Sequence, residues 1–317
     1  MDNRLIATSS PHIGAKDTTT SVMLDVIIAL VPAAIASIYY FGFASAVILA
    51  LAVGTAVGTE ALIQRLTHQR ITINDLSAVI TGLLLGMNLP ASAPWWLPVI
   101  GSFVAIAIGK QVFGGIGNNF INPALAGRAF LVASWPVEMT FWTNPGTQIT
   151  ADTVASATPL GLLKTSPDSV QPLADVILGR IPGTLGETSA ILLLIGGAYL
   201  VYRKIMSWKI PVTYIGTVAI IALLANGFDF MIMAYHVFGG GLMLGALFMA
   251  TDYSSSPVTS KGKIIYGIGA GLITMLIRLY SSSAEGVTYA ILLMNVATPL
   301  IEKYTAPRVF GTGGAKK

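Results

Sequence analysis

The sequence predicts an all-α integral membrane protein, and its composition and the pattern of its apolar runs carry this prediction. Of the 317 residues, 54% are hydrophobic and only 10% are charged, and the mean hydropathy is +0.74. A soluble domain carries about 25% charged residues. One aqueous core cannot bury so much apolar surface, so we expect the bilayer to cover it. Residues 1–20 are polar and carry no cleavage pattern, so we expect no cleaved signal.

Apolar runs in chain order predict about ten membrane-spanning helices. They lie at residues 22–41, 44–66, 76–89, 95–113, 124–134, 188–202, 210–226, 231–250, 264–280 and 287–300. Several runs are shorter than the roughly 20 residues of a straight span, so we expect tilted or broken helices. Gly54 and Gly58 are small residues of the kind that let helices approach closely.

One long polar segment divides the chain into two halves. Residues 1–135 form the first predicted five-helix repeat, residues 136–183 a loop outside the cytoplasm, and residues 184–317 the second repeat. An odd number of spans per half makes the second half enter the membrane upside down, so the repeats would be inverted. A short echo, GLLLG at residues 82–86 and GLMLG at residues 241–245, pairs the third run with the eighth.

The distribution of lysine and arginine predicts the orientation, because cytoplasmic segments carry more of both. With the N-terminus in the cytoplasm, the outer side receives only Lys164, Arg180 and Arg278. Lys110 and most other cations then fall in cytoplasmic loops. Both termini are therefore predicted in the cytoplasm.

The end of the polar segment, residues 181–190, predicts a helix start. Thr184 with Glu187 three residues later matches a capping box, which would place Thr188 and Ser189 in the first helical turn. Free N–H groups and the helix dipole at such a turn suit an anion such as a phosphate. A plain helix cap is the alternative, and it is far more common than a phosphate site.

Several polar residues within or beside apolar runs require a partner or a role, because charge is costly in a bilayer. Arg128 follows a Gly- and Asn-rich break, and it would either bind a phosphate or cap a broken helix. Asp25 and Glu60 lie nearer the ends of their runs, where structural pairing or snorkelling is favoured over ion handling. Thr251 and Asp252 would form a cap or turn, or hold the polar edge of a ring.

The absence of cysteine limits the redox chemistry that this chain can perform alone. It excludes disulfides, thiolate zinc sites and cysteine-ligated iron–sulfur clusters within the chain. His12, His68 and His236 are too few and too scattered to predict a metal cluster. Redox chemistry would need an organic cofactor or the metal of a partner. The residues alone leave a transporter and a redox subunit both open, and the net charge of +4 gives no nucleic-acid signal.

Three stretches resemble signatures of a known family. They are GNNFINPALAGRAFL at residues 117–131, residues 23–32, and FMATD followed by SPVT within residues 248–259. The family contains the D subunit of the Rnf complex and the B subunit of the sodium-pumping NADH:quinone reductase. The resemblance implies a fold similar to urea-channel proteins. It also implies a flavin-carrying subunit of a complex in the bacterial cytoplasmic (inner) membrane. This complex moves electrons between ferredoxin and NAD and couples their transfer to Na+ or H+ transport. The alternative is a ten-helix channel or secondary transporter without a flavin.

The resemblance also implies cofactors and partners. The family carries FMN on a threonine through a phosphoester, in a pattern similar to Ser/Thr-Gly-Ala-Thr, and here LGET at residues 185–188 makes Thr188 the acceptor. A noncovalent riboflavin is also implied. The implied partners are the membrane subunits A and E, the flavin-carrying G subunit, the iron–sulfur subunits B and C, and the lipid bilayer, without nucleic acid. The candidate cofactor-binding residues are Thr188, Gly186, Glu187, Ser189, Arg128, Asn118, Asn119, Asn122, Thr251 and Asp252, and no residue is predicted to bind a metal.

Overall fold

The computed structural model describes residues 18–147, 155–281 and 286–307, and in these ranges every element is helical apart from one isolated β-bridge. The first half contains α1 (Thr19–Phe41), α2 (Phe43–Leu66), η1 (Ile73–Asp75), α3 (Ser77–Met87), α4 (Trp96–Ala107), η2 (Gln111–Phe113) and α5 (Pro123–Ser134). The polar segment carries α6 (Pro136–Met139), α7 (Pro159–Thr165), η3 (Pro167–Ser169) and α8 (Leu173–Leu178). The second half contains η4 (Leu185–Glu187), α9 (Ala190–Tyr202), α10 (Lys209–Ala225), α11 (Phe230–Phe238), α12 (Leu242–Leu244), the π-helical η5 (Gly245–Met249), α13 (Ser260–Tyr280) and α14 (Val287–Thr305).

The described helices include several that can cross a membrane, which confirms the prediction of an all-α, multi-pass membrane protein. Among the described residues, four segments are long and apolar enough: α1, α2, Trp96–Phe113 and α13. The pair formed by α11 and Leu242–Met249 adds a fifth if this pair is one span, and it bends by 60° at the break between its parts. Four further apolar helices (α3, α5, α9 and α10) have only 10–17 residues. The expectation of broken or short helices is thus met.

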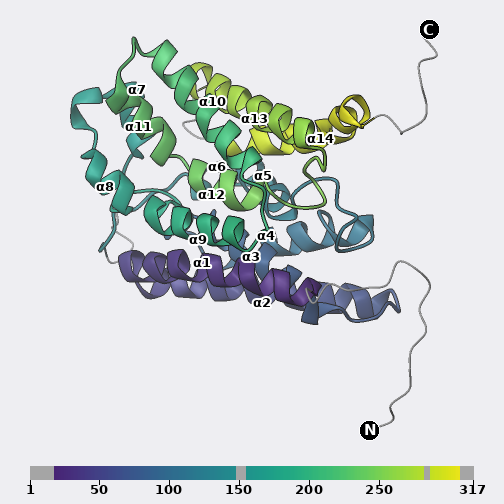
Figure 1. The fold of residues 1–317 in the computed structure, drawn as a ribbon. Coiled ribbons are helices and arrows are strands. Elements are labelled where there is room, and N and C mark those ends of the chain that lie inside the picture. The colour runs from purple at the N-terminus through teal and green to yellow at the C-terminus, as the bar shows by residue number, and fades with distance from the viewer. Residues whose placement is uncertain (1–17, 148–154, 282–285, 308–317) are drawn as a thin grey trace, which may run out of the picture.

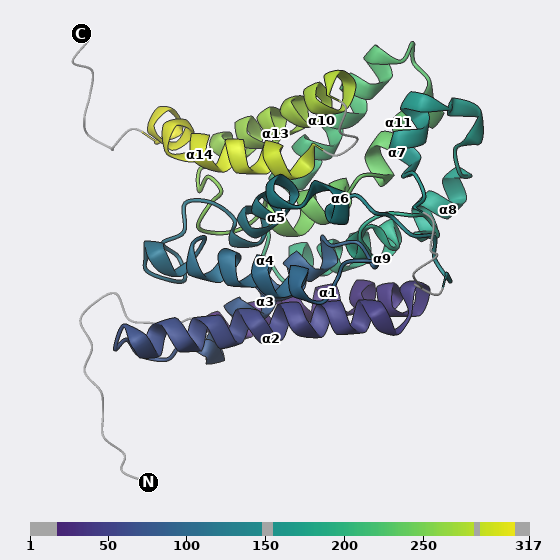
Figure 2. The ribbon, with the colours of Figure 1, turned by 180° about the vertical axis from the view of Figure 1, so that it is seen from behind.

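The helices form a layered bundle (Figures 1 and 2). The pair α1 and α2 lies along one edge, α10, α13 and α14 lie along the opposite edge, and the shorter helices lie between them. The two halves contact each other where α1 packs against α9 and where α5 packs against α14. The start of α1 and the end of α14 lie at one end of the bundle, and α7 and α8 lie at the other.

Close approach of the helices depends on glycines other than the two that the sequence indicated. A Cβ at Gly82 of α3 would lie 2.7 Å from the Ala52 carbonyl oxygen, and one at Gly196 of α9 would lie 2.3 Å from the Ala29 carbonyl oxygen. Gly54 and Gly58 have no neighbouring atom within 4 Å and lie on the exposed face of α2. The prediction that this pair brings helices together is therefore wrong within this chain.

The helix that follows the polar segment starts later than its capping-box pattern predicted. Thr184 lies in extended conformation and its backbone bridges to Pro90, while its hydroxyl donates to the Glu187 carboxylate at 3.2 Å. The helix α9 begins only after Ser189, whose φ of 59° turns the chain and whose hydroxyl accepts from the Leu192 N–H at 3.4 Å. The short 3-10 helix η4 does follow Thr184, but the longer helix predicted to start there begins only at Ala190, so Thr188 precedes its first turn.

The GLLLG and GLMLG echo occupies unequal positions in the two halves. Residues 82–86 form the second half of α3, whereas residues 241–245 begin at the N-cap of α12. The echo therefore gives no support to a repeat.

Candidate cofactor site

A cavity of about 350 Å³ lies between the two halves, toward the end of the bundle where α1 begins. Its walls are mostly apolar, with polar side chains gathered from four separate parts of the chain. This combination is typical of small-molecule and cofactor sites. The polar side chains that line it are Thr19, Ser77, Thr81, Lys110, Asn119, Asn122, Thr251, Asp252, Tyr253 and Ser254.

Two of the family-like stretches meet at this cavity. Asn119 donates from Nδ2 to the Asp252 Oδ2 atom at 3.2 Å, and Asn122 donates from Nδ2 to the Met249 carbonyl oxygen at 3.1 Å. Asn122 also caps α5, because its Oδ1 atom accepts from the Leu125 N–H at 3.2 Å. Its side chain thus joins the start of α5 to the end of the π-helical η5.

The Asp252 carboxyl group lies at this junction and lines the cavity. Burial raises its pKa, and hydrogen bonds from Ser255 and Asn119 oppose that rise. The structure therefore brings together Asn119, Asn122, Thr251 and Asp252 of the predicted residues. Asn118 does not join them, because it is exposed and donates to the Gly114 carbonyl oxygen at 3.2 Å.

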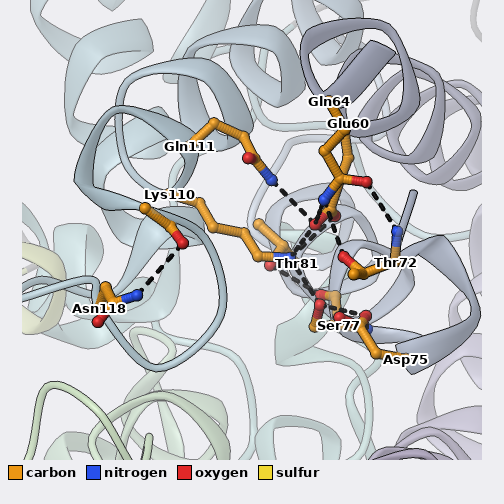
Figure 3. A network of polar contacts seen from close by, with 10 residues as sticks. Glu60, Gln64, Thr72, Asp75, Ser77, Thr81, Lys110, Gln111 and Asn118 are labelled. Carbon is orange, nitrogen blue, oxygen red and sulfur yellow. Dashed lines mark hydrogen bonds and ion pairs between the residues drawn. The ribbon is translucent and has the colours of Figure 1, made fainter. Parts of the chain in front are cut away.

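A buried ion pair joins Lys110, which lines the cavity, to Glu60, which does not (Figure 3). The Lys110 Nζ atom lies 2.8 Å from both Glu60 carboxylate oxygens and 2.6 Å from the Ser77 hydroxyl oxygen. Lys110 is 2% exposed and Glu60 is 0% exposed. Lys110 thus lies in the turn between α4 and η2, but it is buried against Glu60 rather than exposed in a loop. The expectation of a structural partner for Glu60 is confirmed.

The other predicted intramembrane acid also has a partner. Asp25 accepts from Arg203 Nη2 at 2.9 Å and from the Tyr199 hydroxyl at 2.6 Å, which ties α1 to α9. The sequence indicated both acids but not that Lys110 is the partner of Glu60. The available signal was that Lys110 lies within an apolar run of the same half.

The stretch predicted to carry FMN lies against the end of α3 and against α12, outside the lining of the cavity. Leu185 donates its N–H to the Leu89 carbonyl oxygen at 2.9 Å. A Cβ at Gly186 would lie 2.5 Å from Leu244 Cδ2 and 2.8 Å from the Met87 carbonyl oxygen. Only glycine therefore lets η4 fit between the end of α3 and α12.

The Thr188 hydroxyl is buried in this arrangement. Its oxygen donates to the Leu185 carbonyl oxygen at 2.6 Å, and the residue is 1% exposed. The expectation of an accessible hydroxyl is therefore not met. The chemistry of the neighbourhood still fits a phosphoester, because the N–H groups of Ala190 and Ile191 belong to the first turn of α9, where the helix supplies no acceptor. The hydroxyl must leave the Leu185 carbonyl before it can carry a phosphate.

Two buried arginines donate hydrogen bonds to residues at the ends of helices. Arg128 donates from Nη1 to the Asn88 Oδ1 atom at 2.7 Å, and Asn88 is the C-cap of α3. This contact ties Arg128 of α5 to the end of α3. Arg278, which the orientation argument counts on the outer side, is only 1% exposed and donates to carbonyl oxygens of His236, Gly239 and Gly240 at the end of α11.

These features define a class of protein: a multi-pass membrane protein with a cofactor-sized cavity between two helical halves. Comparison with known proteins gives the family. A sequence profile of the NQR2, RnfD, RnfE family matches residues 6–311, so the chain belongs to this family.

Individual relatives cover nearly the whole chain. The chain is 55% identical to the D subunit of the Na(+)-translocating ferredoxin:NAD(+) oxidoreductase complex of Acetobacterium woodii, over 99% of this chain and 97% of that protein. It is 44% identical to the D subunit of the proton-translocating ferredoxin:NAD(+) oxidoreductase complex of Clostridium ljungdahlii, over 98% of this chain and 97% of that protein. It is 38% identical to the D subunit of the ion-translocating oxidoreductase complex of Yersinia enterocolitica, over 96% of this chain and 97% of that protein.

Proposed function

We propose that this chain is the flavin-carrying D subunit of an ion-translocating ferredoxin:NAD oxidoreductase complex in the bacterial cytoplasmic membrane. The observation that carries the proposal is the 55% identity, over nearly the full length of both chains, to the D subunit of such a complex. The complex is an oxidoreductase, and the chain acts as one of its subunits. Because the chain has no cysteine, iron–sulfur clusters belong to other subunits. The expected partners are the membrane subunits A and E, the flavin-carrying G subunit and the iron–sulfur subunits B and C.

The proposal includes ten spans in two inverted repeats with a fold similar to urea channels. The packing of the helices supports it. In the first half α2 packs against α3 and α4, and α4 packs against α5. In the second half α10 packs against α11 and α13, and α13 packs against α14.

Thr188 is the proposed point of covalent FMN attachment. Support comes from the hydroxyl directly before α9 and from the dipole of that helix, which favours a phosphate by about 0.3–1 kcal/mol. Glycine at position 186 keeps η4 against α3 and α12. The bound flavin would supply reversible electron transfer, while this chain would hold its phosphate and exclude water.

The cavity between the halves is the proposed site of the noncovalent riboflavin. Its volume of about 350 Å³ falls within the range of about 300–1,000 Å³ that is usual for small-molecule sites. Apolar walls suit the faces of the ring. Asn119, Asn122, Thr251 and Asp252 supply donors and acceptors for its polar edge.

The attachment site is tested by replacing the acceptor hydroxyl. Thr188→Val removes the hydroxyl and keeps the shape of the side chain, so the complex should assemble without a fluorescent band for this chain on a denaturing gel. Ser189→Asn is the matched control, because asparagine keeps the N-cap and tolerates the positive φ at this position. It should keep the flavin, and intact mass should show one attached FMN on the wild-type and Ser189→Asn chains and none on the Thr188→Val chain. A fluorescent Thr188→Val chain would place the flavin elsewhere. A wild-type chain without any flavin would favour a channel or secondary transporter.

A further inference from the structure

A continuous series of hydrogen bonds runs from the protein surface to the wall of the cavity (Figure 3). The exposed Thr72 hydroxyl accepts from Gln64 Nε2 at 2.8 Å, and the same nitrogen lies 3.3 Å from Glu60 Oε1. Glu60 bonds to Lys110, and Lys110 bonds to Ser77. Lys110 and Ser77 line the cavity, whereas Glu60 and Gln64 do not. The series thus has one end at the surface and the other end at the cavity.

Three oxygen atoms of this series surround the Lys110 ammonium group. Its three N–H donors match the two Glu60 oxygens and the Ser77 hydroxyl. Ser77 donates its own proton to Asp75 Oδ1 at 2.5 Å, which leaves the lone pairs of its hydroxyl for Lys110. A new negative charge in the cavity would compete with Glu60 for this ammonium group.

Glu60 cannot remain charged and alone if Lys110 moves. Its side chain is fully buried, and a buried carboxylate without a counter-charge is strongly unfavourable. Gln64 and Gln111 donate amide protons to Glu60 Oε1 at 3.3 Å and 2.9 Å, which does not replace a positive charge. Loss of the ammonium group therefore requires another cation at this carboxylate.

We propose that the Glu60–Lys110 pair is a charge-coupling cation site, in which Lys110 turns toward an electron that arrives in the cavity and Glu60 then binds a cation from the Thr72 surface. The inference rests on the proposed function, which supplies a redox-active occupant for the cavity. The cation is H+ or Na+. The relative from Acetobacterium woodii is named as a subunit of a Na(+)-translocating complex, and the relative from Clostridium ljungdahlii as a subunit of a proton-translocating complex.

The step balances in charge and in atoms. One electron leaves a reduced partner protein of the complex, which is oxidised by one electron, and reaches the occupant of the cavity. One cation enters the site of Glu60. If the cation is H+, one O–H bond forms on the Glu60 carboxyl group and the proton comes from water. If it is Na+, only the coordination of the ion changes. The charged groups that face this site are Lys110 itself, Asp75 through Ser77, and Asp252 across the cavity.

Reduced-minus-oxidised infrared difference spectroscopy of the purified complex tests the proposal, because it reports carboxyl groups directly. The wild-type spectrum should contain a Glu60 signal that is lost completely in Glu60→Gln. Uptake of H+ gives a protonated-carboxyl band that shifts in D2O, and uptake of Na+ gives a carboxylate band that requires Na+. Arg203→Gln alters a half-exposed ion pair outside the cavity lining, so it should keep the signal.

The double variant Glu60→Gln/Lys110→Met guards against a loss of folding. It removes both buried charges together, which proteins tolerate better than the loss of one. The double variant should assemble and also lack the signal. Identical wild-type and Glu60→Gln spectra, in complexes that release one noncovalent flavin per chain on denaturation, would overturn the inference. Wild-type complex that releases no such flavin would instead overturn the proposed function.

Discussion

At the scale of residues, the buried cations Lys110 and Arg278 are balanced in two different ways. Lys110 meets a carboxylate from a neighbouring helix. Arg278 instead meets backbone carbonyl oxygens where α11 ends, and a helix C-terminus carries partial negative charge. The second solution also stabilises the break between α11 and α12, because it gives the carbonyl groups there a donor.

Replacement of Arg278 by glutamine should therefore destabilise the protein. Hydrogen bonds to charged groups contribute about 1.5–3 kcal/mol each, and Arg278→Gln weakens three of them at once. We expect a lower apparent unfolding temperature of the purified complex. Arg203→Gln is the matched control, because the Arg203 side chain is 45% exposed and such pairs contribute about 0–1 kcal/mol. Equal unfolding temperatures for both variants would show that Arg278 does not support the break.

The sequence could predict which acids need partners but not which cations supply them. Asp25 and Glu60 stand out in apolar runs, and both prove to be paired. Lys110 and Arg278 lie close to the ends of their runs, where the count of positive residues treats every cation as a loop residue. Their burial depends on the fold of the surrounding helices, which the one-dimensional pattern does not contain.

At the scale of elements, the sequence located most helices well and their contact faces poorly. A helix lies in each of the ten apolar runs. The spacing of Gly54 and Gly58 predicted a close contact, yet the contact is made by Gly82 from the neighbouring helix. Spacing identifies a smooth face, but it does not say whether a helix or lipid covers that face. The late start of α9 was equally hidden, because the bridge between Thr184 and Pro90 joins distant parts of the chain.

The contact between α1 and α9 should depend on Gly196. A Cβ there would lie 2.3 Å from the Ala29 carbonyl oxygen, so Gly196→Ala forces two backbones apart. Such overpacking typically costs about 1–3 kcal/mol. Gly216→Ala in α10 is the control, because no atom lies within 4 Å of its added methyl group and alanine favours the helix by about 1 kcal/mol. Thermal unfolding should show a lower temperature for the first variant and an equal or higher one for the second. A stable Gly196→Ala protein would contradict the close packing.

At the scale of the whole molecule, the two family-like stretches at residues 117–131 and 248–259 show what sequence can and cannot give. Their resemblance to a family marked Asn119 and Asp252 as candidates, but their contact across the cavity required the fold. The two residues are far apart in the chain and come from opposite halves. Helix pairing between the halves, through α1 with α9 and α5 with α14, brings these stretches together.

The same fold gathers the helix ends that carry most of the positive charge. At the end of the bundle where α1 begins, Thr20 donates to the Asn74 carbonyl oxygen, and the Lys209 ammonium group donates to the Ser260 hydroxyl. The exposed cations of this end include Arg65, Arg70, Arg203, Lys204 and Lys261. At the opposite end, Lys164 donates to the Ser281 carbonyl oxygen. Removal of the buried Lys110 and Arg278 from the count leaves the bias in place.

The orientation of the whole chain follows from this bias and can be measured directly, because the chain has no cysteine of its own. Ser169 in η3 and Gln69 after α2 are both exposed, and they belong to opposite ends of the bundle. In intact cells, a membrane-impermeant thiol reagent should label Ser169→Cys and not Gln69→Cys. After the membrane is permeabilised both should react, which controls for the accessibility of the Gln69→Cys thiol. Labelling of Gln69→Cys alone in intact cells would invert the topology. The surface at Thr72, from which the cation is proposed to enter, would then face outward.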